Sequence, residues 1–120
     1  MSDSQALLVL GGSEQSDLVE TLFDMGFVPL VRKKMFRALE MIRHEKFAGV
    51  VVDRGNLEED ALEFVLNVRD IDEELPVIVV GNSVNESENE VLANLDNTFL
   101  MHKTSEQKSH EEFERILRTS

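Results

Sequence analysis

The chain has 120 residues, 42% of them hydrophobic and 30% charged, which predicts one globular domain rather than a disordered segment. It contains no cysteine, so disulfide bonds, thiolate metal sites and cysteine nucleophiles are excluded. Its 24 acidic and 12 basic residues give a formal net charge of −12, a poor match for a phosphate backbone, so we expect no direct contact with nucleic acid.

Short apolar runs alternate with amphipathic stretches along the chain, which is typical of repeated strand–helix units. The sequence predicts strands at residues 6–10, 27–31, 48–53, 75–80 and 98–102. It predicts helices at residues 16–26, 34–45, 58–70, 86–95 and from Ser105 or Ser109 through Leu117. Pro29 lies in the second strand, and because proline donates no hydrogen bond to a ladder, it favours an edge position there.

Five strands in alternation with five helices restrict the fold to a few open parallel sheets covered on both faces. The flavodoxin-like (βα)5 sandwich with strand order 2-1-3-4-5 is the commonest at this size, and it places the strand of Pro29 at an edge. We expect residues 1–120 to form one such α/β domain, the N-terminal part of a longer protein. Neither a signal peptide nor a membrane-spanning stretch is recognisable, so we expect a cytoplasmic protein without membrane contact.

Asp53 closes the apolar run Gly49–Asp53, whose residues are apolar on both faces and therefore predict a central strand. In open α/β sheets, ligands bind in the crevice beyond the carboxyl ends of the strands. A carboxylate at that place is a candidate nucleophile, metal ligand or structural anchor.

The chain resembles the CheY-like receiver domains of response regulators along nearly its whole length. Three stretches carry the resemblance: ALEMIRHEKFAGVVVD (38–53), DRGNLEEDALEFVLNVRDIDEELPVIVVGN (53–82) and TFLMHK (98–103). The resemblance implies that Asp53 is the phosphoacceptor. The alternative is that Asp53 only caps the turn that follows its strand.

Phosphoryl transfer in this family needs Mg²⁺, held by two adjacent acidic residues directly after the first strand. Gly11 and Gly12 occupy these positions and offer no side-chain oxygen. Glu14, with Asp53, is a weak candidate metal ligand, and Asp17 is a further candidate from a displaced position. The alternative for Glu14 and Asp17 is that they are acidic residues at a helix N-terminus, where they suit the helix dipole. We therefore expect no metal and no cofactor, with Mg²⁺ only if its site is displaced.

The resemblance assigns the remaining site positions less directly. Gly81 stands where the family has a hydroxyl residue, so Ser83 is a candidate phosphoryl contact, or else part of a turn. Lys103 is the candidate lysine for the phosphoryl charge, although the local pattern places His102 there instead. Phe99 is the candidate switch aromatic, or else a plain core residue.

The resemblance, with these departures, predicts an atypical receiver (a pseudo-receiver) of two-component signalling that acts through protein contacts and is no enzyme. Its expected partner is a histidine kinase or a downstream effector domain, with a homodimer through residues 86–117. The alternative is a phosphorylatable receiver that uses Asp53 with a displaced metal site. A flavin protein or small enzyme is disfavoured, since there is no tryptophan or tyrosine for a flavin and no nucleophile beside a base.

Overall fold

The computed structural model describes residues 5–81, 85–102 and 106–118 of the chain. Its strands are β1 (Ala6–Leu10), β2 (Val28–Arg32), β3 (Gly49–Asp53), β4 (Val77–Val80) and β5 (Thr98–Met101). Its helices are α1 (Asp17–Asp24), α2 (Met35–His44), α3 (Ala61–Ile71), α4 (Glu86–Asn94) and α5 (Glu106–Arg118), with a short 3-10 helix η1 (Arg54–Asn56) after β3.

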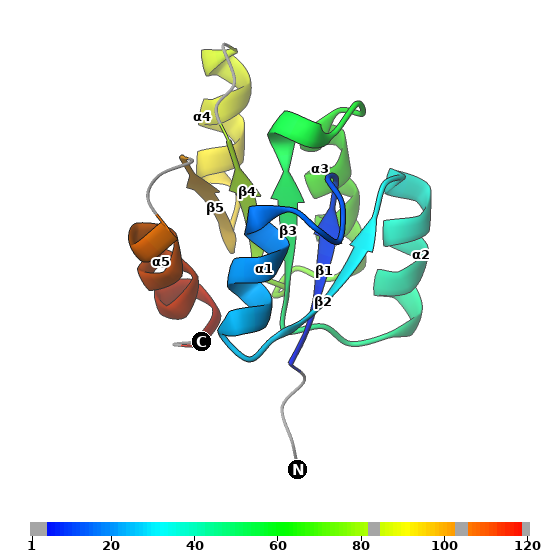
Figure 1. Ribbon diagram of the computed structural model, residues 1–120. Helices are drawn as coiled ribbons and strands as arrows, with labels where there is room; N and C mark the ends of the chain where they lie inside the picture. The colour runs from blue at the N-terminus through cyan, green and yellow to red at the C-terminus, as the bar shows by residue number, and fades with distance from the viewer. Residues whose placement is uncertain (1–4, 82–84, 103–105, 119–120) are drawn as a thin grey trace.

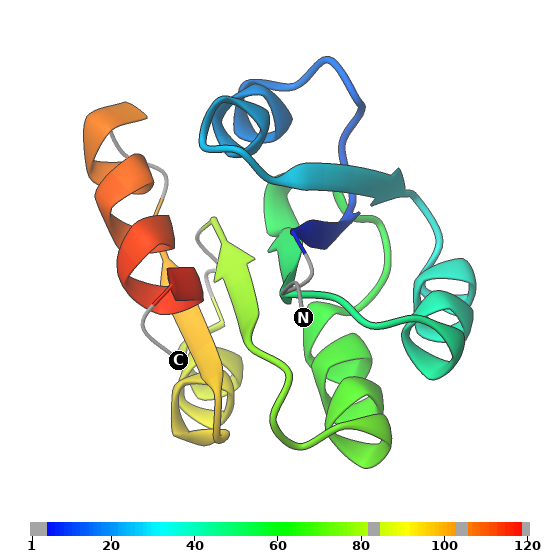
Figure 2. The same ribbon diagram turned by 90° about the horizontal axis from the view of Figure 1, so that it is seen from below.

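The five strands form one parallel sheet in the order β2-β1-β3-β4-β5, as the sequence predicted. Helices α1 and α5 cover one face of this sheet, and α2, α3 and α4 cover the other (Figures 1 and 2). Pro29 lies in the edge strand β2, where its missing N–H leaves the ladder to β1 intact. The predicted flavodoxin-like sandwich is therefore confirmed.

The core has two halves because side chains of successive strand residues point to opposite faces of the sheet. Leu8, Val50 and Val52 pack against the side of α2, α3 and α4, whereas Val9 and Val51 pack against the side of α1 and α5. All five residues of β3 are buried, which fixes this strand in the middle of the sheet. Asp53, at its end, is held by a rigid element.

Most element boundaries differ from the predicted ones by one to three residues, and those of α3, β4 and α5 are instructive. Helix α3 begins at Ala61 because the Asp60 carboxylate caps it, accepting from the backbone N–H of Leu62 at 2.9 Å. Strand β4 begins only after Pro76. Ser109 lies inside α5, so a start of that helix at Ser109 was wrong, and Ser105 lies outside the described residues.

None of the helices in the described parts of the chain combines the length and the apolar character that crossing a bilayer requires.

Candidate functional site

The site lies at the rim where the parallel strands end. Asp53 pairs in register with Val80 of β4, and its side chain is only 1% exposed. Its Oδ2 accepts a hydrogen bond from the Asn56 Nδ2 at 3.0 Å, within the first turn after the strand. Its Oδ1 is buried without a hydrogen-bond partner among the described residues. Burying a carboxylate oxygen without a donor is costly, so this atom marks a place where a donor or cation is favoured.

The turn after β1 brings backbone, not carboxylates, against Asp53. Gly11 and Gly12 have φ angles of +98° and +77°, which favour glycine strongly. A Cβ atom on Gly11 would lie 2.8 Å from the backbone oxygen of Asp53, and one on Gly12 would lie 3.1 Å from its Oδ2. The two positions at which the family carries its metal-binding acids are therefore adjacent to Asp53, and they are occupied by a tight glycine turn.

A cavity of about 380 Å³ opens beside Asp53, between α1 and α5. It is lined by Ser16, Asp17, Leu18, Glu20, Thr21, Asp53, Asn56, Val80, Ser109 and Phe113. Glu14 is exposed and does not line this cavity, whereas Asp17 does. In the part of the chain that the structure describes, no three acidic or histidine side chains are grouped so as to hold a metal ion. These donors do not fit the magnesium site of a receiver, because among the described residues Asp53 alone offers a buried carboxylate there.

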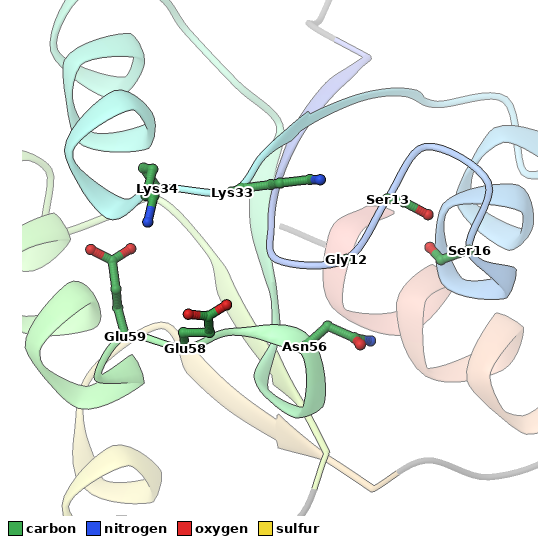
Figure 3. Close-up of a pocket in the computed structure, with 8 residues that line it drawn as sticks. All are labelled: Gly12, Ser13, Ser16, Lys33, Lys34, Asn56, Glu58 and Glu59. Atoms are coloured by element: carbon green, nitrogen blue, oxygen red, sulfur yellow. The ribbon is translucent and has the colours of Figure 1, made fainter.

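A second cavity, of about 420 Å³, lies over the ends of β1, β2 and β3 (Figure 3). Its lining residues are Gly12, Ser13, Ser16, Lys33, Lys34, Asn56, Glu58 and Glu59. In Figure 3 the Lys33 side chain extends toward the Gly12–Ser13 turn. The Glu59 Oε1 accepts from the Met35 backbone N–H at 2.7 Å and so caps α2. Two lysines and two glutamates line this cavity, so its walls carry both signs of charge.

Arg54 follows Asp53 directly, and sequence reasoning gave it no role. Its Nη1 donates to the Asn89 Oδ1 at 2.7 Å, and its Nη2 donates to the Glu88 Oε1 at 3.2 Å. The arginine side chain is 10% exposed, and Glu88 and Asn89 both belong to α4. No local pattern signals this contact, because its partners lie more than thirty residues apart in the chain.

The other predicted site residues are placed as follows. Phe99 lies half-buried in β5 and packs against the core on the side of α1 and α5. Ser83 and Lys103 lie outside the described residues. His102 is exposed directly after β5, so the choice between His102 and Lys103 stays a prediction.

No family model matches the sequence, and no curated protein matches it significantly. Solved structures of receiver domains match nearly the whole chain. The chemotaxis response regulator CheY4 of Vibrio cholerae is 17% identical, with a TM-score of 0.78 over 96% of this chain and 100% of that one. The receiver domain of the sensor histidine kinase PA1611 of Pseudomonas aeruginosa, with a magnesium ion coordinated in its active site cleft, is 11% identical, with a TM-score of 0.79 over 98% of this chain and 100% of that one.

The beryllofluoride-activated NtrC4 receiver domain dimer is 20% identical to this chain, with a TM-score of 0.75 over 95% of this chain and 97% of that one. This chain therefore has the fold of the CheY-like receiver domains of response regulators. At such identities the likeness establishes the fold alone.

Proposed function

We propose that the chain is a pseudo-receiver domain of two-component signal transduction, which acts through protein contacts without magnesium-dependent phosphorylation of Asp53. The observation that carries the proposal is the glycine turn against Asp53, with a Gly12 Cβ position only 3.1 Å from the carboxylate. The fold is that of receivers, whereas the residues that would hold the cation lack side-chain oxygens.

The charge balance at the rim supports this proposal. A phosphoryl group on Asp53 would add about −1.5 to −2 charges to a crevice where the Asp53 carboxylate is already buried. Without a divalent ion, Lys103 or His102 would be the cation for that charge, since Arg54 is hydrogen-bonded to α4. A single lysine compensates a dianion poorly, which disfavours the adduct.

The partner we propose is a histidine kinase or a downstream effector domain, bound in the cytoplasm. The surface would be the face of α4, β5 and α5, residues 86–117, through which a second copy of the chain would also pair. Helix α4 presents exposed Glu86 and Glu90 on this face, and α5 presents exposed Lys108 and Arg115. Opposite charges on two elements of one face suit a two-fold pairing. We propose neither a catalytic activity nor a resident cofactor.

Intact-mass measurement after incubation with acetyl phosphate and Mg²⁺ tests this function. We expect the mass to stay unchanged, because the rim lacks the residues that hold the metal. A stoichiometric gain of one phosphoryl group, absent from the Asp53→Asn variant, would favour instead a phosphorylatable receiver with a displaced metal site. The visible absorbance of the protein as purified tests the flavin alternative. A flavin absorption band would support that alternative, and its absence is what we expect.

A further inference from the structure

The Arg54 guanidinium connects the rim of the sheet to α4. It reaches that helix with both terminal nitrogens, at 2.7 Å from the Asn89 Oδ1 and 3.2 Å from the Glu88 Oε1. The arginine side chain is 10% exposed and that of Glu88 is 22% exposed, so water screens the pair only weakly. A hydrogen bond between charged groups in such surroundings stabilises more than a surface ion pair does.

Helix α4 packs on β5 and α3 but buries few of its own side chains. It is nine residues long, and Leu92 is its one fully buried residue. A helix of this length is marginal by itself in water and depends on tertiary contacts. The Asn85 side chain caps the helix at the Glu88 N–H, 3.0 Å away, which fixes the turn that carries both partners of Arg54.

The guanidinium is directed to α4 and not to the neighbouring carboxylate. Within the described residues no ion pair joins Arg54 to Asp53; the Asp53 Oδ1 and the Arg54 Nε are both buried without a hydrogen-bond partner. Arg54 therefore gives its two terminal nitrogens to α4 although a buried carboxylate belongs to the preceding residue.

We infer that Arg54, Glu88 and Asn89 form a clamp that holds α4 in one position on the sheet whatever the state of Asp53. The inference deepens the proposed function, on which it rests for the role of α4 as part of the partner surface. A pseudo-receiver needs such a device, because no phosphoryl group is there to select the arrangement of that helix. Arg54 acts here as a positioning residue.

Amide hydrogen exchange, followed by NMR without Mg²⁺ or a phosphodonor, tests the clamp. In Arg54→Ala we expect the amides of α4 to exchange about tenfold faster, while the core amides of β1 and β3 keep their rates. Glu88→Gln and Asn89→Ala should each give part of the effect. Arg37→Ala, which removes an exposed arginine of α2, is the matched control and should leave α4 unchanged.

Two outcomes would overturn the clamp: unchanged α4 exchange in Arg54→Ala, or equally faster exchange in α4 and the core strands, which would mean a loss of global stability. A separate variant tests whether the position of α4 is independent of Asp53. In Asp53→Asn we expect wild-type exchange in α4, and faster exchange there would refute that part. The exchange experiment contains no phosphodonor, so its result does not depend on whether Asp53 can be phosphorylated. A phosphoryl adduct in the intact-mass experiment would therefore overturn the pseudo-receiver proposal and leave the exchange result for the clamp unchanged.

Discussion

Asp53 and the glycine turn beside it are constrained by the same lack of space. Among the described residues, the Asp53 carboxylate accepts one hydrogen bond, from the Asn56 side chain. Gly11 lies close to the backbone oxygen of Asp53. Positive φ angles and the short distances to Asp53 make glycine the residue that fits at both positions of the turn. A carboxylate pair at these two positions would need a differently shaped loop.

Gly11→Ala is expected to lower the free energy of unfolding by about 2–4 kcal/mol. The added methyl group would meet the Asp53 backbone oxygen at 2.8 Å, on a backbone with φ of +98°. Urea unfolding followed by circular dichroism measures the loss. Gly55→Ala is the matched control: its nearest atom is the Asp53 Oδ1 at 3.9 Å, so we expect a change under about 1 kcal/mol. Equal losses in the two variants would contradict this picture of the turn.

At the scale of elements, Arg69 connects α3 to the segments that precede β4 and β5, at the amino-terminal ends of these strands. Its guanidinium donates to the carbonyl oxygens of Asp72 at 2.9 Å, of Leu75 at 2.7 Å and of Asn97 at 2.7 Å. Burial lowers the pKa of Arg69, and the nearby Asp72 and Asp96 carboxylates raise it in part. The side chain therefore fastens the loops that lead into β4 and β5.

Arg69→Lys is expected to lower the free energy of unfolding by about 1–3 kcal/mol. A lysine keeps the charge, but its single ammonium group cannot reach carbonyl oxygens in several directions as the planar guanidinium does. Arg37→Lys, at an exposed position of α2, is the control and should change stability by less than about 0.5 kcal/mol. If the two variants unfolded at the same urea concentration, the proposed role of Arg69 would be wrong.

The elements differ in how far the sequence predicts them. Strands β3 and β4 were foreseeable because they are apolar on both faces, and the Asp60 cap fixed the start of α3 later than the apolar pattern indicated. The contacts that fasten helices across the fold were not foreseeable. Glu59 caps α2 at Met35, and Arg54 reaches Asn89 on α4, through side chains far apart in the sequence. The hydrophobic periodicity of the sequence does not predict contacts between such distant side chains.

For the molecule as a whole, alternation and the handedness of parallel crossovers limited the fold to a few open sheets, and the strand order came by analogy with the commonest of them. The meeting of Gly11, Gly12 and Asp53 was predictable too, because the carboxyl ends of parallel strands gather at one rim. The cavity beside Lys33 was not predictable, because its walls come from three loops that are separate in the sequence. The roles of Ser83 and Lys103 stay predictions.

We expect the chain to self-associate through residues 86–117 and to sediment as a dimer in a concentration-dependent manner. Val91, on α4, is 45% exposed, so Val91→Asp should place a charge in the interface and weaken association about tenfold. Leu66, on α3 and 44% exposed, lies outside that face, and Leu66→Asp serves as the control. Analytical ultracentrifugation decides: a monomer at every concentration, or the same weakening in both variants, would rule out this interface.

The most direct measurement is a magnesium titration of the protein followed by the NMR signals of its backbone amides. If the turn at Gly11 and Gly12 has replaced the cation site, these two residues and Asp53 will show no saturable shift, and Asp53→Asn will behave as the wild type does. Saturable shifts centred on Asp53 and Asp17, lost in Asp53→Asn, would contradict the pseudo-receiver and restore metal-dependent phosphorylation.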